Sequence, residues 1–199
     1  MNGASAVDLV LASTSAYRRD LLARFGLPFR TIAPGVDETP EPGENAASLA
    51  VRLAQRKAHA VALRCPGAVV IGSDQAAECD GALLGKPGDA AAAQGQLERA
   101  SGRAVVFHTA LCVVDTRGDA HVALAACDRT TVRFRELAAQ EIARYVARDR
   151  PLDCAGSFKA EGLGIALFER IDSLDPSALI GLPLIALSRL LRELGVEVI

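Results

Sequence analysis

Several side chains in this chain are suited to binding a phosphorylated ligand, and the first group lies near the N-terminus. A short apolar run is followed by Ser13, Thr14 and Ser15, and then by the adjacent Arg18 and Arg19. Hydroxyl groups and the unpaired N–H groups of a helix start donate hydrogen bonds to anions, and arginine adds positive charge. The segment is therefore typical of a phosphate site, although it also fits a serine-capped helix with two solvated arginines.

Asp74 is the strongest single candidate for catalysis. It follows a β-branched run over residues 68–72 and stands between Ser73 and Gln75. We expect a buried strand that delivers the carboxylate at its C-terminal end, which is where ligands of open α/β sheets bind. A carboxylate placed there can hold a metal ion or accept a proton from an attacking water. The alternative is an acid that only caps a turn.

Two lysines and a pair of acids could complete such a site. Lys57 in a helix and Lys86 in a Gly-Lys-Pro turn could each neutralise phosphate oxygens, although single lysines usually lie on the surface. The turn lacks the glycine spacing and the following Ser or Thr of a Walker loop. Glu38 and the adjacent Asp37 lie in a Pro/Gly-rich loop, where acids are usually solvated. Alone, they indicate little.

The segment from Cys154 to Ile165 combines three glycines with Ser157, Lys159 and Glu161. Glycines allow a backbone to approach a ligand closely. Lys159 and Glu161 could read the polar edge of a base, and a flexible bend with two solvated charges is the alternative of equal weight.

Hydrophobic patterning indicates how these residues are positioned. It predicts strands over 9–12, 68–72, 103–114, 121–134 and 164–168, and helices over 16–25, 46–63, 88–100, 138–148 and 183–194. Asp80-Gly81 is a two-residue hairpin signal, and residues 116–119 join two long strands into a second hairpin. The mixture is typical of an α/β protein with two lobes around a cleft.

Composition excludes several classes of protein. The 199 residues carry 22 Lys+Arg against 24 Asp+Glu, only 4% are aromatic and Trp is absent, so we expect no polynucleotide partner. The five cysteines are scattered and form neither a disulfide framework nor a zinc motif. The three histidines stand in helix or strand patterns, which disfavours nucleophilic catalysis through histidine. The absence of a signal peptide or a long apolar run predicts a cytoplasmic protein with no membrane contact, and a homodimer is the default assembly.

Six motifs in order along the chain resemble those of the Maf family of nucleoside triphosphate pyrophosphatases. They are ASTSAYRR (12–19), VDET (36–39), RLAQRK (52–57), IGSDQ (71–75), GKP (85–87) and AGSFKAEGLGI (155–165). The resemblance covers nearly the whole chain and ends in IGLPL (180–184). It implies one Maf-like domain over residues 1–199, with the Maf and inosine-triphosphate-pyrophosphatase fold, in which a central mixed β-sheet is flanked by helices and a cleft separates two lobes.

The resemblance is strongest to the YceF-like branch, whose members are taken to hydrolyse 7-methyl-GTP to 7-methyl-GMP and diphosphate. It implies that Asp74 is the proton acceptor and that Glu38 and Asp74 place a divalent metal cation, Mg2+ or Mn2+. The phosphate-binding residues that it implies are Ser13, Arg18, Lys57 and Lys86.

The resemblance assigns substrate choice to Tyr17, Gln75 and Glu161. A 7-methylated guanine is a cation, so the Glu161 carboxylate and the π-face of Tyr17 would favour it over neutral guanine, by ~1 kcal/mol for the cation–π contact. The branch that acts on dTTP and UTP carries Arg, Thr and Gln at these positions. Tyr17 departs from the Trp expected in the YceF-like branch, so base selectivity is expected to be looser.

Two alternative functions remain open from the sequence. The first is the same reaction on another base, by a dTTP/UTP or broad-specificity house-cleaning pyrophosphatase. The second is a nucleotide-binding regulator of cell division, in which catalysis would be incidental. The acids and lysines at 38, 57, 74 and 86 disfavour this second alternative.

Overall fold

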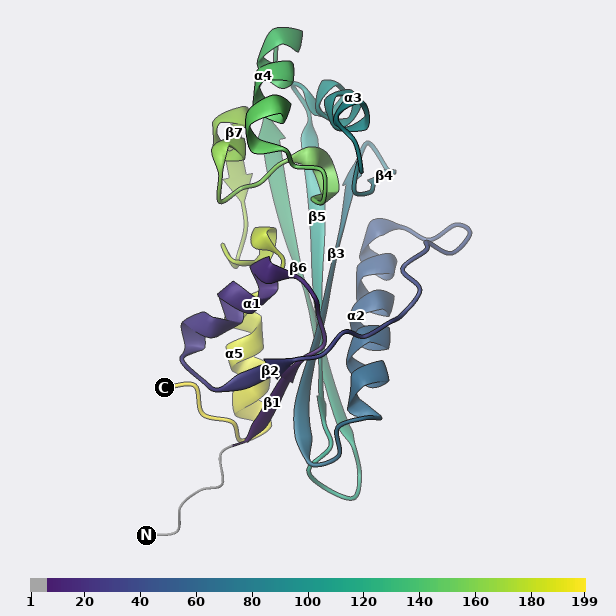
Figure 1. Ribbon diagram of the computed structural model, residues 1–199, viewed down its shortest axis with the longest axis vertical. Helices are drawn as coiled ribbons and strands as arrows, with labels where there is room; N and C mark the ends of the chain where they lie inside the picture. Colours follow the sequence, from purple (N-terminus) through teal and green to yellow (C-terminus); the bar gives the residue numbers. More distant parts are fainter. Residues whose placement is uncertain (1–6) are drawn as a thin grey trace.

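The computed structural model describes residues 7–199, which form a seven-stranded mixed sheet with helices on both faces (Figure 1). The strands are β1 (Asp8–Leu11), β2 (Phe29–Thr31), β3 (Ala68–Cys79), β4 (Ala82–Leu84), β5 (Ala104–Asp115), β6 (Val122–Phe134) and β7 (Phe168–Asp172). The helices are α1 (Ala16–Leu22), α2 (Ala46–Ala62), α3 (Ala90–Ala100), α4 (Ala139–Asp149) and α5 (Leu184–Glu193). Short 3-10 turns are η1 (Ala23–Phe25), η2 (Ala155–Ser157), η3 (Leu163–Leu167) and η4 (Ala178–Ile180). The prediction of a central mixed sheet flanked by helices is confirmed.

The strand order β2-β1-β3-β5-β6-β7 divides the molecule into two lobes, with β4 paired to the end of β3. β1 runs parallel to β2 and β3, and the other pairs are antiparallel. The long strands β3, β5 and β6 run through both halves of the molecule (Figure 1). We call the half that contains β1, β2, α1, α2 and α5 the lower lobe, and the half that contains β4, β7, α3 and α4 the upper lobe.

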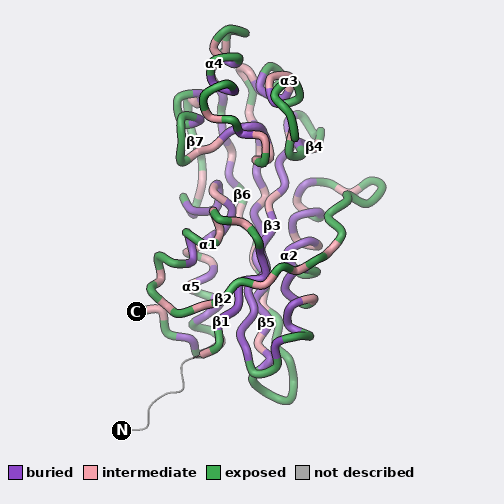
Figure 2. The backbone as a smooth tube through the Cα atoms, in the orientation of Figure 1, coloured by how far each residue is buried: buried purple, intermediate pink, exposed green. Residues whose placement is uncertain are grey.

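The lower lobe has a hydrophobic core on each face of the sheet. Leu9 and Leu11 of β1 pack in the cluster that includes Leu21 and Leu22 of α1, whereas Val10 packs in the cluster built on α2. This alternation follows from the two-residue period of a strand. Figure 2 shows the resulting buried stretches along the central strands.

Aromatic rings fill much of the upper-lobe core. Phe107, Phe134, Phe158 and Phe168 meet edge to face with ring centroids 4.8–5.6 Å apart. Such edge-to-face contacts add to the stabilisation from burial alone. Phe158 lies in the 154–164 segment, so this aromatic cluster anchors that segment to the sheet.

Most elements agree with the sequence predictions, but β2 was not predicted and two of the predicted strands differ from the structure. The strand predicted over 68–72 continues to Cys79, because the equally long β5 pairs with it along its length, with Asp74 opposite Ala110. The strand predicted over 164–168 is wrong: η3 occupies this stretch and β7 begins only at Phe168. A Cβ at Gly164 would lie 2.4 Å from the carbonyl oxygen of Lys159, so the chain turns tightly here.

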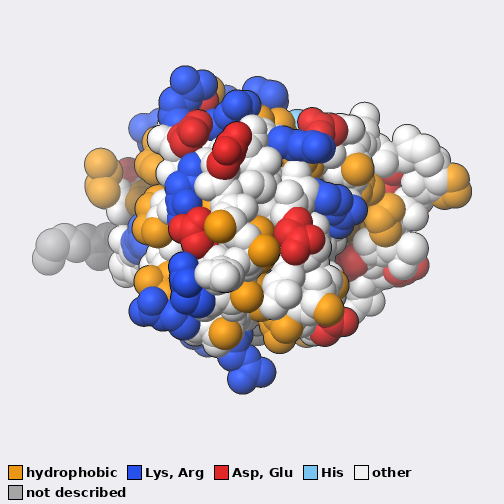
Figure 3. Space-filling view, turned by 90° about the horizontal axis from the view of Figure 1, so that it is seen from above, with side chains coloured by type: hydrophobic (Ala, Val, Ile, Leu, Met, Phe, Trp, Pro, Cys, Tyr) orange, Lys and Arg blue, Asp and Glu red, His pale blue; other side chains and the backbone are white. Residues whose placement is uncertain are grey.

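The end face of the upper lobe has mixed charge. Figure 3 shows Lys and Arg side chains interspersed with Asp, Glu and apolar side chains over this face. Of the helices described within residues 7–199, none has both the length and the hydropathy needed to cross a membrane.

Candidate active site

The side chains singled out in the sequence converge on one cavity of about 530 Å³ between the two lobes. The lower lobe supplies the turn after β1, the loop before α2, and α2 itself. The upper lobe supplies the loop after β4 and the 154–164 segment, while β3 contributes from between them. The lining includes all nine predicted residues, which are Ser13, Tyr17, Arg18, Glu38, Lys57, Asp74, Gln75, Lys86 and Glu161. The predicted cleft between lobes is confirmed.

Lys57 joins two carboxylates at the centre of this cavity. Its Nζ lies 2.5 Å from Oδ1 of Asp74 and 2.5 Å from Oε1 of Glu38. Lys57 and Asp74 are buried, with 4% and 6% of their surfaces exposed, whereas the Glu38 side chain is half-exposed. Glu38 therefore faces the open side of the cavity and Asp74 its floor.

The charges around Glu38 keep its carboxyl ionised. Burial by itself raises the pKa of Glu38, but the hydrogen bond and charge of Lys57 oppose it, together with the charges of Lys86 and Arg18. The net result is a pKa below the usual range of a glutamate. Glu38 is thus an anionic oxygen donor at neutral pH.

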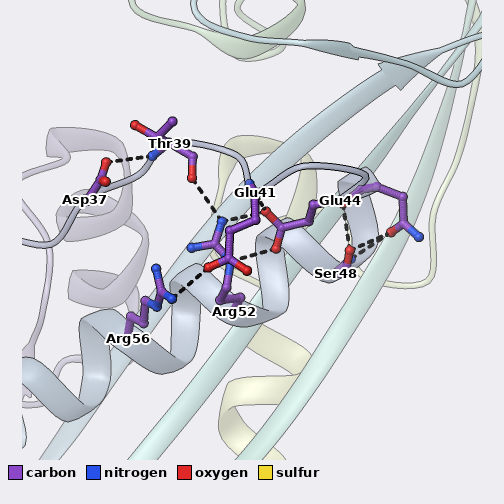
Figure 4. Close-up of polar contacts among 8 residues, drawn as sticks. Asp37, Thr39, Glu41, Glu44, Ser48, Arg52 and Arg56 are labelled. Carbon is purple, nitrogen blue, oxygen red and sulfur yellow. Dashed lines mark hydrogen bonds and ion pairs between the residues drawn. The ribbon is translucent and has the colours of Figure 1, made fainter.

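A polar clamp on α2 holds the loop that carries Glu38 (Figure 4). Arg52 donates to both carboxylate oxygens of Glu44, at 2.6 and 2.5 Å, and to the backbone carbonyl of Thr39 at 3.1 Å. Arg56 pairs with Glu41 at 2.8 Å. These contacts hold Thr39, which directly follows Glu38, and also Glu41 and Glu44 further along the same loop.

Asp37 has a local role that differs from that of its neighbour. Its Oδ1 accepts a hydrogen bond from the backbone N–H of Thr39 at 2.9 Å, which closes a short turn (Figure 4). Asp37 does not line the cavity, and Glu38 does. Of these two adjacent acids, only Glu38 lines the cavity.

The turn after β1 places Arg18 at the cavity and Arg19 away from it. Ser15 caps α1 by accepting from the N–H of Arg18, and Ser13 accepts from the N–H of Ser15 at 3.1 Å. Arg19 is exposed and pairs with Asp20, so of the two arginines only Arg18 lines the cavity. Leu21 and Leu22 are buried, and they stand three and four residues after Arg18 on the same face of the helix. This spacing in the sequence could have indicated that Arg18, and not Arg19, points inward.

The guanidinium of Arg18 is oriented by a backbone carbonyl. Its Nε donates to the oxygen of Gly181 at 2.9 Å, and within residues 7–199 the two terminal nitrogens make no hydrogen bond, so they can bind a ligand. Burial lowers the pKa of Arg18, and the charges of Asp74 and Glu38 oppose that shift. Ser73, which the sequence analysis did not single out, is within 3.0 Å of the same carbonyl oxygen. It ties the loop after η4 to β3.

Tyr17 and Glu161 both line the cavity, from different lobes, and the Glu161 charge acts on the Tyr17 hydroxyl; we call this region the base end. Burial raises the pKa of the Tyr17 hydroxyl, and the nearby Cys154, Asp153 and Glu161 raise it further. Tyr17 is therefore a neutral aromatic side chain next to a carboxylate. Phe107 and Phe158 also line the cavity, so its lining combines aromatic surface with negative charge.

Gln75 is held in one orientation by its neighbours. Its Nε2 lies 3.0 Å from the carbonyl of Ala178, 3.1 Å from that of Leu179 and 2.9 Å from the hydroxyl of Thr109. Carbonyls only accept hydrogen bonds, so the amide nitrogen must point toward them. Among residues 7–199, none donates to the remaining Oε1, which leaves an acceptor for a ligand.

Lys159 does not face the cavity, so the expectation that it reads a base edge is wrong. Its Nζ donates to the backbone carbonyl of Asp149 at 3.0 Å, and its backbone N–H donates to the hydroxyl of Tyr145 at 3.0 Å. Lys159 thereby fastens the 154–164 segment to α4. The glycines here serve packing: a Cβ at Gly156 would lie 3.0 Å from the ring of Phe107.

The donor set of the cavity fits a hard divalent cation that is completed by substrate oxygens. Glu38 and Asp74 each place an oxygen 2.5 Å from the same ammonium group, so those oxygens are close enough to share one ion. Within the described residues, no group of three or more His, Cys, Asp or Glu could hold a metal by itself. One or two carboxylates completed by phosphate oxygens and water are the usual environment of Mg2+.

Over almost its full length, the sequence is similar to bacterial proteins that are named 7-methyl-GTP pyrophosphatase. It is 58% identical over 187 residues to the 7-methyl-GTP pyrophosphatase of Xanthomonas oryzae pv. oryzae, covering 94% of this chain and 96% of that protein. Identity to the protein of the same name from Aromatoleum aromaticum is 58% over 189 residues, covering 94% and 95%. For the relative from Ralstonia nicotianae, identity is 52% over 185 residues, covering 93% and 94%.

A solved structure, that of the Staphylococcus aureus Ham1 protein, aligns with a TM-score of 0.44 and 16% identity over 64% of this chain and 71% of that one. The model of the family described as Maf-like protein matches residues 8–194, which include every residue that we place at the cavity. The chain belongs to the Maf-like protein family.

Proposed function

We propose that this protein is a nucleoside triphosphate pyrophosphatase that hydrolyses 7-methyl-GTP to 7-methyl-GMP and diphosphate. The observation that carries the proposal is the division of one cavity into two chemically different ends. One end gathers Lys57, Asp74, Glu38 and Arg18, and the other gathers Tyr17 and Glu161. A triphosphate matches the first end and a cationic base matches the second.

The base end supports a methylated guanine by charge and by hydrogen bonding. N7-methylation gives guanine a positive charge, which favours the carboxylate of Glu161 and the π-face of Tyr17. The N1–H and N2 amino groups of guanine are adjacent donors, and Gln75 Oε1 and the Glu161 carboxylate are acceptors in residues that line the cavity. Thymine and uracil present a single N–H between two carbonyl groups. The oxygens of these carbonyls would be repelled by the Glu161 carboxylate.

The phosphate end supports attack of water on the α-phosphorus. Asp74 Oδ1 is held by Lys57, so Oδ2 is the oxygen that accepts the proton of the attacking water. Arg18, Lys57 and Lys86 neutralise the charge that develops on the departing diphosphate. The Gly181 carbonyl keeps the Arg18 fork aimed at the phosphates.

Glu38 and Asp74 are the residues that would hold a divalent cation, Mg2+ or Mn2+. When bound, this cation supplies positive charge that polarises the phosphate oxygens and stabilises the leaving group. Lys57 contacts both carboxylates, so it would reposition its ammonium toward the phosphates once both carboxylates bind the cation.

Release of diphosphate by the purified protein tests the proposal. Wild-type protein would be assayed with 7-methyl-GTP, GTP, ATP, dTTP and UTP, each with Mg2+ or Mn2+. Selective release from 7-methyl-GTP is expected. Preference for dTTP or UTP would overturn the substrate and keep the reaction, and no release from any nucleotide would overturn both.

A further inference from the structure

A buried glutamine outside the cavity connects two of its walls. Gln96 lies on α3 with 8% of its surface exposed. Its Nε2 donates to the carbonyl oxygen of Gly85 at 3.0 Å, and its Oε1 accepts from the hydroxyl of Ser157 at 2.6 Å. One planar amide therefore bridges two segments that are 72 residues apart in sequence.

Each of these segments carries a residue of the site. Gly85 immediately precedes Lys86, which lies at the phosphate end. Ser157 ends η2 and is followed by Phe158 and Glu161, which both line the cavity, Glu161 near Tyr17. Gln96 is thus hydrogen-bonded to both segments that carry these cavity residues.

Ser157 needs such a partner more than an ordinary loop residue does. It is fully buried and has a φ of 61°, in the left-handed region that a side chain with a Cβ rarely adopts. A conformation of this kind persists only when the surroundings enforce it. The short hydrogen bond to Gln96 is one such constraint, and the edge-to-face packing of the adjacent Phe158 is another.

The chemistry of the bridge requires a side chain that both donates and accepts hydrogen bonds. Gly85 offers only an acceptor and Ser157 is the donor, so residue 96 must donate at one atom and accept at the other. An apolar side chain would leave both groups buried without partners. An ionised carboxylate would place a second acceptor against the Gly85 carbonyl.

We propose that Gln96 is a positioning residue that holds the Lys86 loop and the Glu161 segment at a fixed separation across the cavity. This inference rests on the proposed function for the assignment of one end of the cavity to phosphate and the other to the base. The hydrogen bonds of Gln96 do not depend on that function. The competing explanation is that Gln96 only stabilises the upper lobe. That role would lower stability without changing how either end of the cavity binds.

Two readouts separate the ends of the cavity. Calorimetric binding of inorganic tripolyphosphate, which has no base and requires no turnover, reports on the Lys86 end. The ratio of kcat/KM for 7-methyl-GTP to that for GTP reports on the Glu161 end. Thermal unfolding of each variant reports on stability alone.

Gln96→Leu is expected to weaken tripolyphosphate binding about fivefold, since one net hydrogen bond is lost at each wall, and to lower the kcat/KM ratio by about the same factor. Ser157→Ala is expected to lower the ratio and leave tripolyphosphate binding unchanged. Gln94→Leu, on the same helix but outside the cavity lining, is the matched control and should change neither. The proposal is overturned if Gln96→Leu lowers only the unfolding temperature.

Gln96→Glu keeps the inference testable should the leucine variant fail to fold. Its carboxyl can donate to the Gly85 carbonyl only when protonated. Tripolyphosphate binding relative to wild type at the same pH should therefore be weak at pH 8 and recover toward pH 5. A defect of equal size at both values would contradict the proposal. If wild type hydrolyses no nucleotide, the proposed function fails, while the tripolyphosphate measurement still decides the role of Gln96 at the Lys86 end.

Discussion

Gly72 of β3 lies directly against Ala58 of α2. A Cβ at residue 72 would come within 2.8 Å of the Ala58 Cβ, 2.6 Å of its nitrogen and 2.4 Å of the Ala54 carbonyl oxygen. No side chain fits into this space. The helix therefore approaches the strand closely enough for Lys57 to reach Asp74, two residues along β3 from the glycine.

Gly72→Ala is accordingly expected to be strongly destabilising. Overpacking of a rigid core costs roughly 1–3 kcal/mol, and here the obstructing atoms belong to the backbone of α2. Urea unfolding would measure the loss. Gly95→Ala is the matched control, because nothing lies within 4 Å of a Cβ there and alanine favours a helix by about 1 kcal/mol. Equal stability of the two variants would contradict the packing argument.

Asp74→Asn should remove most of the activity while the fold is kept. An amide does not accept the proton of the attacking water, and loss of a general base costs about 100- to 10,000-fold in rate. Diphosphate release would be compared with that of Glu78→Gln, on the same strand but outside the cavity lining. Activity of Asp74→Asn within tenfold of wild type would exclude Asp74 as the proton acceptor.

Arg52→Lys should loosen the loop that carries Glu38. Lysine cannot reproduce the two-pronged contact with Glu44 or reach the Thr39 carbonyl at the same time. We expect a higher Mg2+ concentration for half-maximal activity and weaker Mn2+ binding by calorimetry. Arg56→Lys, which changes only a half-exposed pair with Glu41, should leave both values near wild type. The role assigned to Arg52 is excluded if the two variants behave alike.

Tyr17→Trp should increase discrimination between 7-methyl-GTP and GTP. A cation–π contact contributes about 0.5–1 kcal/mol at an exposed site and is strongest with Trp, so the kcat/KM ratio should rise by at most about fivefold. Glu161→Gln should decrease the same ratio, because it keeps an acceptor but removes the negative charge. A ratio that stays constant in both variants would show that the base lies elsewhere.

Stability should fall at acidic pH in part through Glu44. The hydrogen bond from Arg52 is the main cause that lowers the pKa of Glu44 from 4.5 to about 2. A group with a depressed folded-state pKa contributes stability above its unfolded value, and this contribution is lost as pH falls through the folded value. Urea unfolding between pH 5 and pH 2 should show a shallower pH dependence in Glu44→Gln than in wild type.

Local patterns in the sequence predict most of the fold. The Asp80-Gly81 hairpin, the long β5–β6 hairpin and α2 all form where turn residues and apolar periodicity place them. Strand length was less predictable. An apolar run shows where β3 begins, but its continuation past Gly72 depends on pairing with β5, a strand that begins only at Ala104.

The candidate site likewise has residues that the sequence predicts and residues that it does not. Asp74, Lys57 and Glu38 could be proposed from residue type and motif, and the structure brings them together. The orientation of Gln75 and the bridge through Gln96 could not, because they depend on carbonyls and hydroxyls from distant segments. Residues that act through other residues leave no pattern in the local sequence.

The continuity of β3, β5 and β6 through both lobes limits how the molecule can move. Hinge closure normally uses a few loop or terminal residues that absorb large dihedral changes. Here, rotation of one lobe against the other would have to bend three hydrogen-bonded strands, β3 at Asp74 and Gln75, and β5 and β6 at the residues in register with them. Substrate entry and product exit must therefore depend on the surrounding loops. We expect the floor of the cavity to keep one geometry throughout the catalytic cycle.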